Sequence, residues 1–504
     1  MKIFSREQIS IIDRQTKILE PILEIDLMER ASDALVDELI LQSSASDRIA
    51  VVAGMGNNGG DALAIARILL EINYSVDVYL PELGGKRSEA NQINLERLKM
   101  MDGVSFIYLN SQKDFHDLDK YDFLVDGLYG SGLNRPLDGF VCEVISWMNA
   151  SGVEIISIDL PSGLMCDENP EHNDSIVRAT QTLTVGFPKL SLFFRENEPF
   201  FGQWNLVQFG LSETAIAETK TNYHWLVQSD VFPILKSRNR FSHKGSYGHG
   251  LLLAGSKGKF GAALLASRGA LRAGLGLLTT HSPDAAAMAL QIALPEAMSS
   301  IDSGREFITE LPELTKYSAV AAGPGMGIQG ETQKVIHRLL LESKVPLVLD
   351  ADALNILANN PKWLMILPEN TILTPHPAEF DRLSGIIVKT DAKRLEIAEQ
   401  FAISYRSIVV LKGAFTRIIF PDGTVWFNST GNPGMATGGS GDVLTGIILG
   451  LLCQGYTSGE AVMLGVFLHG RSADLRVRES SQESLIASEI ADYLGDAFAS
   501  LKWR

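Results

Sequence analysis

The sequence predicts an α/β fold with two domains, each built as three α/β/α layers. Short apolar runs alternate with helical stretches over residues 49–185, and the alternation restarts at residue 251. Because strands that are covered on both faces read as continuous apolar runs, this pattern indicates parallel sheets with helices on either side. The small, polar stretch 211–223 separates the halves, and 504 residues exceed one typical domain. We expect domains over residues 1–215 and 225–504, joined by a linker.

The first half should open with helices, because apolar residues recur at helical spacing over residues 1–40, with Pro21 as an interruption. Predicted strands then cover residues 49–53, 76–80, 104–109, 123–126, 155–159 and 182–185, and predicted helices cover residues 60–70, 89–101 and 141–150. In the second half the predicted strands are residues 251–254, 319–322, 347–350 and 408–411, and the predicted helices are residues 261–273, 331–341 and a long helix from Gly441.

Composition narrows the class of protein. A formal net charge of −16 argues against nucleic acid or an anionic membrane as a main partner. The cysteines, Cys142, Cys166 and Cys453, are odd in number and lack metal-site spacing, so we expect reduced thiols. Charges interrupt the N-terminal residues, which argues against a secretory signal, and the most apolar window, 447–453, is too short to span a bilayer. We expect a soluble, cytoplasmic protein.

The segment 432–446, NPGMATGGSGDVLTG, carries the strongest chemical signal. Four glycines lie from Gly434 to Gly441, and Asp442 follows before an apolar run. Such a loop lets backbone amides at a helix N-terminus approach an anion, and an acid there can take a proton from a hydroxyl that attacks a phosphoryl group. The same helix start should lower the pKa of Asp442. The alternative is a glycine-rich turn that only caps a buried helix.

Polar residues also gather where predicted strands of the first half end. Asn57, Asn58 and Asp61 follow the first strand in VVAGMGNNGGD, whose spacing differs from the GxGxxG fingerprint. Asp126 and Asp159 each end a later strand. Because open α/β sheets bind ligands at the carboxyl ends of their strands, we expect these side chains to converge. Taken singly, an acid that follows a strand is more often a turn former or helix cap than a functional group.

Two roles follow from that convergence. Oxygens of Asn58, Asp126 and Ser162 are candidate ligands for a hard monovalent cation, and Asp159 is a candidate acid/base group. Lys189, in VGFPKL, is a candidate partner for Asp159 or for a ligand phosphate, with a plain surface lysine as the alternative.

The second half contains further candidate segments, namely residues 255–276, GPGMG (323–327), LDADALN (349–355), TPHPAE (374–379) and LKGAFT (411–416). Asp350, Asp352 and Glu379 are candidate ligands for Mg²⁺, which usually keeps waters and bridges phosphates. His376, held between two prolines, is a candidate substrate contact or a structural histidine. Lys412 and its neighbouring amide are suited to neutralising nucleotide phosphates. There is no GxxxxGK[ST], so a P-loop enzyme is not predicted.

These motifs resemble known families. The second half resembles the ribokinase-like superfamily through Gly439–Asp442, and its segments together resemble ADP-dependent NAD(P)H-hydrate dehydratases. GMGNNGGD, DGLYGSGL and DLPSG in the first half resemble NAD(P)HX epimerases, which implies a Rossmann-like domain. The two in this order are similar to the bifunctional nicotinamide nucleotide repair family over nearly the whole chain. Met55 and Ala62 depart from that family, which often has proline and glycine there.

The resemblance implies a specific chemistry. The substrates would be the hydrates NADHX and NADPHX, whose R and S forms the epimerase interconverts with K⁺ bound by Asn58, Asp126 and Ser162. The dehydratase would use ADP and Mg²⁺ to phosphorylate the ring hydroxyl of the S form, and elimination would return NAD(P)H with AMP and phosphate. Asp442 would be the base of this reaction, and Asp159 the catalytic group of the other.

The implied contacts are assigned residue by residue. In the epimerase the hydrate would contact Asn57, Asn58, Gly59, Gly60, Asp61, Gly130, Ser131, Gly132, Leu133, Asn134, Arg135, Pro136 and Asp159. In the dehydratase it would contact Ala262, Gly325, Gly327, His376 and Asp442. The adenine nucleotide would contact Lys412, Gly413, Ala414, Phe415, Thr416, Asn432, Gly434, Thr437, Gly438, Gly439 and Gly441.

Two other functions are compatible with parts of the sequence. A small-molecule kinase, acting on a vitamin alcohol or a sugar, would use the same ribokinase-like site and release a stable phosphorylated alcohol. Alternatively, the first half would be a non-catalytic binding or assembly module, and the R hydrate would then remain untouched. The resemblance also implies a homo-oligomer.

Overall fold

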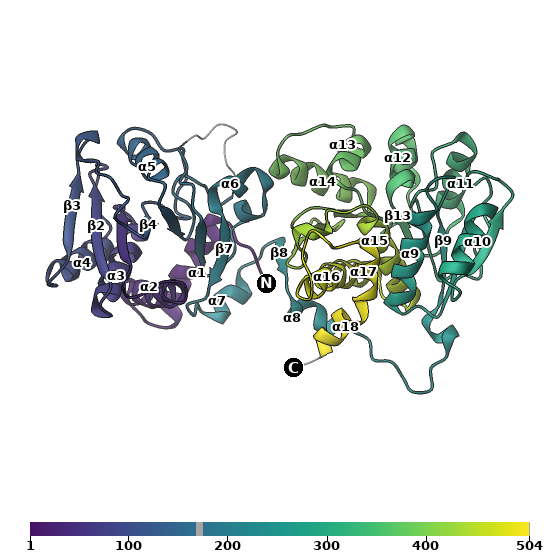
Figure 1. Cartoon of the computed structure of the whole chain (residues 1–504), viewed down its shortest axis with the longest axis horizontal. Helices are drawn as coiled ribbons and strands as arrows, with labels where there is room; N and C mark the ends of the chain where they lie inside the picture. Colours follow the sequence, from purple (N-terminus) through teal and green to yellow (C-terminus); the bar gives the residue numbers. More distant parts are fainter. Residues whose placement is uncertain (168–174, 503–504) are drawn as a thin grey trace. The chain divides into compact units, whose positions relative to one another are not determined.

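The computed structural model describes residues 1–167 and 175–502, and the chain forms two compact units, one of residues 2–221 and one of Met1 with residues 222–504 (Figure 1). Part of the stretch predicted as a linker is helical, although the two units divide within it, after Thr221. The stretch contains helix α7 (Glu213–Glu218), whose N-terminus is capped by Ser212, and Ala215 of that helix is fully buried against Phe4 and Ile12. This helix was not predicted because small polar residues at a helix cap resemble those of a loop.

The unit of residues 2–221 is built on seven parallel strands in the order β3-β2-β1-β4-β5-β6-β7. The strands are β1 (Arg48–Ala53), β2 (Ser75–Pro81), β3 (Ser105–Leu109), β4 (Phe123–Gly127), β5 (Glu154–Ile158), β6 (Gln181–Val185) and β7 (Gln203–Val207). The predicted parallel sheet is confirmed, although β7 was not predicted. The strand order reverses between β1 and β4, which is where sheets of this kind bind ligands.

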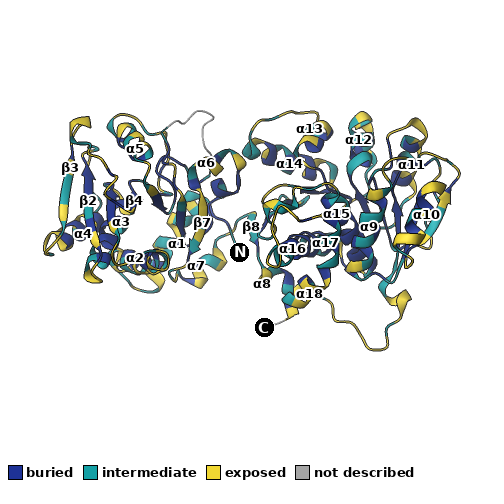
Figure 2. Cartoon of the chain, in the orientation of Figure 1, coloured by how far each residue is buried: buried dark blue, intermediate teal, exposed yellow. Residues whose placement is uncertain are grey.

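Helices cover both faces of this sheet. They are α1 (Arg6–Leu19), α2 (Glu24–Ile40), α3 (Asn57–Glu71), α4 (Glu89–Lys99), α5 (Phe140–Ala150) and the short α6 (Glu198–Phe201). Val51 and Val125 point into one hydrophobic core with α2, α3 and α4, whereas the adjacent residues Ala50 and Leu124 point into a second core with α5. The central strands are therefore buried between two helical layers, whereas the edge strands β3 and β7 are partly exposed (Figure 2).

The other unit is built on ten strands in the order β11-β10-β9-β12-β13-β14-β15-β16-β17-β8. They are β8 (Tyr223–Leu226), β9 (His249–Leu253), β10 (Leu277–Pro283), β11 (Met298–Asp302), β12 (Ala319–Ala322), β13 (Leu347–Leu349), β14 (Ile372–Leu373), β15 (Ile408–Leu411), β16 (Arg417–Ile419) and β17 (Val425–Asn428). All pairs are parallel except those of β16 with β15 and with β17. Residues 412–416 and 420–424 are too short for a parallel crossover, so these strands form hairpins.

Helix α15 (Ser440–Cys453) is buried along nearly its whole length and lies against α9 (Phe260–Ala273). A Cβ at Gly446 would lie 1.9 Å from the Ala266 carbonyl oxygen, and one at Gly269 would lie 2.4 Å from that of Val443. Glycine at these positions therefore lets the two backbones touch. The remaining helices are α8 (Gln228–Val231), α10 (Asp284–Ala293), α11 (Gly330–Glu342), α12 (Ala351–Asn359), α13 (Pro377–Ser384), α14 (Asp391–Tyr405), α16 (Ser458–Val477), α17 (Ala487–Asp492) and α18 (Leu494–Lys502).

Over the described residues, no helix has both the length and the apolar character that a membrane crossing requires.

Candidate active sites

In the N-terminal unit, the glycine-rich turn links β1 to α3 by close backbone packing. A Cβ at Gly54 would lie 2.1 Å from the Leu128 carbonyl oxygen, and one at Gly59 would lie 2.1 Å from the Gly54 carbonyl oxygen. Gly60 packs in the same way against the Met28 side chain. These glycines therefore have a packing role of their own, and their predicted contacts with a ligand stay predictions.

Asp159, directly after β5, is the charged centre of this site. It forms a 2.5 Å ion pair with the Lys189 ammonium, and the Ser131 amide donates to its other oxygen at 2.7 Å. Burial alone would raise the pKa of Asp159, but the Lys189 charge and the Ser131 hydrogen bond outweigh it and hold the pKa below its ordinary value. Asp159 also has φ = +68°, a left-handed conformation that costs energy in a residue other than glycine. The predicted Asp159–Lys189 pair is confirmed.

The structure brings together predicted residues that follow three different strands. A Cβ on Gly130 would lie 2.7 Å from Asp159 Oδ2 and 2.8 Å from Asn58 Oδ1, so the loop that starts at Gly130 lies directly over both side chains. Asn58 Nδ2 is buried and has no hydrogen-bond partner among the described residues. The rest of the loop differs in exposure, with Leu133 buried and Gly132, Asn134, Arg135 and Pro136 exposed.

Asp126 and Ser162 form a buried, hydrogen-bonded pair. Ser162 donates to Asp126 through its hydroxyl at 2.6 Å and its amide at 2.9 Å, and the Ser157 hydroxyl donates at 2.8 Å. Burial raises the pKa of Asp126, and these hydrogen bonds oppose the shift. The Ser162 hydroxyl oxygen also accepts from the Tyr129 amide at 2.8 Å. Several oxygens thus surround a fully buried carboxyl group that has no ion-pair partner among the described residues.

One acid of this site was missed by the sequence analysis. Asp13, on α1, has its pKa raised to about 6 by burial and then by repulsion from Asp159. The pKa of Asp61 is raised well above its ordinary value by desolvation and by the charges of Asp159 and Asp13. Asp13 lies among the polar residues of an amphipathic helix, with no motif around it, so no pattern in the sequence could have singled it out.

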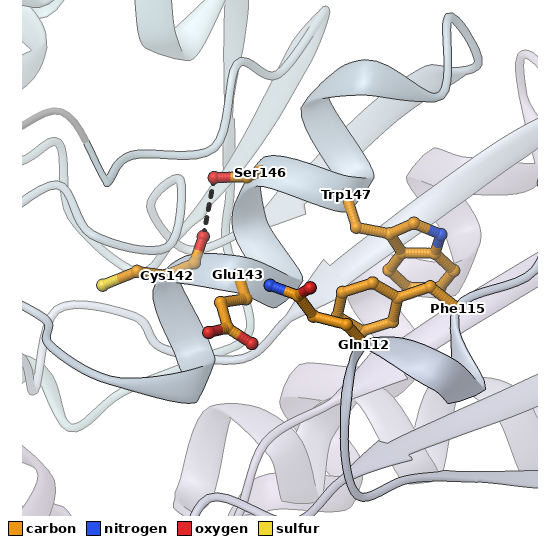
Figure 3. Close-up of a pocket in the computed structure, with 6 residues that line it drawn as sticks. All are labelled: Gln112, Phe115, Cys142, Glu143, Ser146 and Trp147. Carbon is orange, nitrogen blue, oxygen red and sulfur yellow. Dashed lines mark hydrogen bonds between the residues drawn. The ribbon is translucent and has the colours of Figure 1, made fainter.

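A surface pocket of about 560 Å³ also lies in this unit, between the turn η1 (Gln112–Asp114) and α5 (Figure 3). The Phe115 and Trp147 rings stack in it, with centroids 5.0 Å apart, beside Gln112 and Glu143. None of the predicted site residues lines this pocket.

In the C-terminal unit, Lys412 and Asp350 form the centre of the second site. The Lys412 ammonium lies 3.0 Å from Asp350 Oδ1, and the Thr445 hydroxyl donates to Asp350 Oδ2 at 2.6 Å. Burial would lower the pKa of Lys412, but Asp350 and then Glu379 raise it above its ordinary value. A Cβ on Gly441 would lie 3.1 Å from the Lys412 ammonium, so the start of α15 lies directly over this ion pair.

Asp442, in the first turn of α15, shows a pKa opposite to the one predicted. Burial, followed by repulsion from Asp350, raises the pKa of Asp442 to about 7, and attraction to Lys412 only partly offsets this. The expectation that the helix N-terminus would lower the pKa was wrong, because desolvation and neighbouring carboxylates outweigh the helix dipole. A carboxyl group that titrates near neutral pH is well suited to act as a general base.

Two further groups of predicted residues lie around this centre. Asp352 accepts from the Gly327 amide at 2.9 Å and pairs with Lys259 at 3.2 Å. A Cβ on Gly325 would lie 3.1 Å from that of Ala262, so the GPGMG turn rests on the start of α9. His376 caps α13, and Glu379 N donates to its Nδ1 at 3.3 Å while its own amide donates to Glu379 at 2.9 Å. Its side chain is 48% exposed, and burial of the remainder lowers its pKa.

The expected Mg²⁺ ligands do not form a metal cluster. Within residues 1–167 and 175–502, no group of three or more His, Cys, Asp or Glu side chains is placed to hold a metal ion. Both oxygens of Asp350 are engaged by Lys412 and Thr445, and Asp352 is paired with Lys259. The expectation that Asp350, Asp352 and Glu379 contribute to a Mg²⁺ site that also uses waters and substrate phosphates stays a prediction.

The residues expected to contact the nucleotide lie in two turns in which Gly413, Ala414 and Gly438 are exposed and the others are partly buried. Residues 412–416 form the β15–β16 hairpin turn, in which the Gly413 amide donates to the Thr416 hydroxyl at 3.4 Å. Asn432 caps the short helix η7 (Pro433–Met435) by accepting from Gly434 N at 3.1 Å. Gly439 has φ = +91° at the start of α15, and Gly438 beside it is exposed.

His469 supports the turn that leads into α15, and no motif in the sequence predicted this role. Its Nε2 lies 3.0 Å from the Ser440 carbonyl oxygen, and burial lowers its pKa to about 4. The ring is therefore neutral at physiological pH and braces the first residue of α15.

Two α/β units, each with charged groups at the carboxyl edge of its sheet, define an enzyme with two sites. A ribokinase-like superfamily protein from Enterococcus faecalis shares the fold of the C-terminal unit, at 24% identity and a TM-score of 0.50, over 56% of this chain and 98% of that chain. An ADP/ATP-dependent NAD(P)H-hydrate dehydratase from Bacillus subtilis, co-crystallized with ATP/Mg²⁺, is 37% identical over 56% of this chain and 100% of that chain, with a TM-score of 0.49.

Sequence comparisons cover both units. A family model described as NAD(P)H-hydrate dehydratase matches residues 250–495, and one described as YjeF-related protein N-terminus matches residues 24–191. The bifunctional NAD(P)H-hydrate repair enzyme Nnr of Moorella thermoacetica is 36% identical over 98% of this chain and 96% of that protein. The chain belongs to the family of bifunctional NAD(P)H-hydrate repair enzymes.

Proposed function

We propose that this chain repairs hydrated nicotinamide cofactors through two activities. Residues 1–215 would form the domain that interconverts the R and S hydrates, and residues 225–504 the domain that dehydrates the S hydrate with ADP. The observation that carries the proposal is Asp442, a carboxyl group with a pKa of about 7 that lies beside the Lys412–Asp350 ion pair at the start of α15. A base and a fixed cation at a helix N-terminus are the parts that phosphoryl transfer uses.

In the proposed dehydratase reaction, Asp442 takes the proton from the ring hydroxyl of the S hydrate. The hydroxyl oxygen then bonds to the β-phosphorus of ADP, and the bond from that phosphorus to the bridging oxygen breaks to release AMP. Phosphate next leaves the ring with the electrons of the C–O bond, and a proton then passes from the neighbouring ring carbon to water, which restores NAD(P)H. Lys412 and the amides of the turn before α15 hold the negative charge. Phosphorylation is needed because hydroxide is a poor leaving group.

The products distinguish this reaction from that of a small-molecule kinase. With the S hydrate of NADH and ADP, we expect NADH, AMP and phosphate to appear in equal amounts, measured by absorbance and chromatography. A stable phosphorylated alcohol without recovery of NADH absorbance would instead support the kinase.

The rate of dehydration should depend on pH through Asp442. Because a base acts only when it is deprotonated, kcat/KM should be constant above a pH of about 7 and fall below it, by about tenfold per pH unit. The measurement is a pH–rate profile at saturating ADP. The residual activity of Asp442→Asn should lack this acidic limb, and an unchanged limb in that variant would assign the titration to another group.

We further propose that Mg²⁺ reaches the dehydratase site with the nucleotide. Mg²⁺ usually binds substrate phosphates with one or two carboxylates and several waters. Glu379 lies 3.9 Å from the Lys412 ammonium, and Asp352 accepts from the Gly327 amide, so these two remain the candidate carboxylates. When bound, the ion would neutralise charge on the transferred phosphoryl group.

In the epimerase site we propose that K⁺ binds at Asn58, Asp126 and Ser162. The buried Asp126 carboxyl group supports this, because a cation would offset the cost of its burial, which its hydrogen bonds only partly relieve. K⁺ should therefore raise the rate of epimerisation more than Na⁺ at equal ionic strength. Ser162→Ala removes one ligand oxygen and should raise the K⁺ concentration for half-maximal rate at least fivefold. An identical K⁺ dependence in this variant would remove Ser162 from the ligand set.

We also propose a cytoplasmic location, where NAD(P)H and ADP are found, and a homo-oligomeric state. Sedimentation measurements on the full chain test the second proposal.

A further inference from the structure

Arg87 is a partly buried cation that lies against the glycine-rich turn of the N-terminal unit. One guanidinium nitrogen, Nη1, donates to the Gly54 carbonyl oxygen at 3.2 Å and to Asn91 Oδ1 at 2.8 Å. The next residue, Ser88, caps α4 and donates its amide to the Met55 carbonyl oxygen at 3.0 Å. The segment that contains Arg87 is thus fixed directly on the turn from which the predicted ligand contacts of α3 begin.

This guanidinium has no carboxylate partner. Across the described ranges 1–167 and 175–502, no Asp or Glu oxygen lies within 4.0 Å of it, and both of its hydrogen bonds go to neutral oxygens through the same nitrogen. Its Nε and Nη2 groups make no hydrogen bond among the described residues and are not fully enclosed. Burial lowers the pKa of Arg87, with only Glu82 and Tyr108 opposing. Arg67, on α3, differs because it pairs with Glu29 and Glu71.

The other charged groups near the glycine-rich turn indicate which kind of ligand would suit Arg87. Asp13, Asp61 and Asp159 make the site acidic, and the nearby ammonium of Lys189 is already paired with Asp159. A hydrated dinucleotide carries a negatively charged pyrophosphate, and NADPHX carries a 2′-phosphate as well. An acidic site that accepts such an anion needs a cation that its own carboxylates do not neutralise. Arg87 meets this requirement, and its planar fork matches the geometry of a phosphate.

The position of Arg87 in the topology agrees with this chemistry. It follows β2, which lies beside β1 on the side away from β4. In open parallel sheets a dinucleotide lies across the carboxyl ends of the strands, and a cation after the second strand is close to the ribose and its phosphates.

We propose that Arg87 binds a phosphate group of the hydrated dinucleotide and thereby sets substrate affinity in the epimerase site. This inference rests on the proposed epimerase function. Two groups share this chemistry, the pyrophosphate of both hydrates and the 2′-phosphate of NADPHX alone, and comparing the two substrates separates them.

The test measures epimerisation of the R hydrates of NADH and NADPH by the full chain with Arg87→Met and Arg87→Lys. Loss of a charge-assisted hydrogen bond should raise KM roughly 10- to 100-fold, with kcat changed less than threefold and with partial recovery in Arg87→Lys. An increase for both substrates identifies the pyrophosphate, and an increase for NADPHX alone identifies the 2′-phosphate. Arg97→Met, on the helix α4 that follows Arg87 but paired with Glu29, is the matched control and should leave KM unchanged. An unchanged KM for both substrates in Arg87→Met overturns the inference.

A second measurement separates failure of this inference from failure of the proposed function. Phenylglyoxal modifies accessible arginines, and peptide mapping of the full chain shows whether NADPHX protects Arg87. Protection in a chain that epimerises neither hydrate would reject the epimerase function and keep the phosphate site. Epimerisation without protection of Arg87 would reject the phosphate site and keep the function.

Discussion

Replacing Asp442 by asparagine should reduce dehydration of the S hydrate by orders of magnitude while epimerisation continues at the wild-type rate. Asparagine keeps the shape of the side chain but cannot accept the hydroxyl proton. Loss of a general base costs about 10²- to 10⁴-fold in rate, and we expect the upper part of this range because Lys412 and the helix N-terminus cannot replace the base. The measurement is the initial rate of NADH formation from the S hydrate with ADP.

Misfolding cannot account for that loss, because the substitution should not reduce stability. The pKa of Asp442 is raised from its ordinary value to about 7 in the folded chain. The folded state therefore binds this proton more tightly than the unfolded state, and ionisation of Asp442 lowers stability as the pH rises from about 4 towards 7. Asparagine removes this cost, so thermal unfolding at pH 8 should be unchanged or slightly higher. Glu342→Gln, on the surface of α11, is the control and should keep both activities. Near-normal dehydration by Asp442→Asn would remove Asp442 from the mechanism.

The second large effect is expected from Asp159→Asn, which should impair epimerisation and spare dehydration. This variant should lose at least about 100-fold in epimerisation and keep dehydration of the S hydrate within twofold. Asparagine is chosen because Asp159 has φ = +68°, a conformation that asparagine tolerates better than alanine. The measurement follows the R and S hydrates separately by chromatography, without ADP.

The test of Asp159→Asn needs a control for the stability of the folded chain. Lys189 is only 1% exposed, and removing its partner leaves a buried charge, which costs about 3–5 kcal/mol. The double variant Asp159→Asn with Lys189→Met removes both charges and should recover much of the thermal stability without recovering epimerisation. Recovery of epimerisation in the double variant would show that Asp159 acts only by neutralising Lys189.

The sequence was sufficient for features that depend on local order along the chain. Strand β1 and the turn after it could be predicted because the apolar run, the glycines and the following helix are contiguous. Asp159 was placed correctly with Lys189 because both follow strands of one parallel sheet, so topology alone brings them to the same edge. Lys412 and Asp350 converge for the same reason.

Features that depend on packing between distant segments could not be predicted. The pKa of Asp442 is set by burial and by carboxylates from other loops, neither of which its own helix start reveals. Asp13 lies on α1, where its sequence context is that of an ordinary polar residue of an amphipathic helix. His469 supports the turn at Ser440 from the following helix and has no motif around it. The two hairpins that contain β16 were not predicted, because their strands are short and the turns between them have the composition of ordinary loops.

The most direct test of the two-activity account starts from the R hydrate of NADH alone, with ADP, Mg²⁺ and K⁺. The account predicts that the wild-type chain recovers NADH absorbance completely, and that Asp159→Asn recovers it only as fast as the R hydrate epimerises without enzyme. An equimolar mixture of Asp159→Asn and Asp442→Asn should restore full recovery, because each variant supplies the activity that the other lacks. If the wild-type chain leaves the R hydrate unconsumed while it converts the S hydrate, the N-terminal unit is not an epimerase and the account is contradicted.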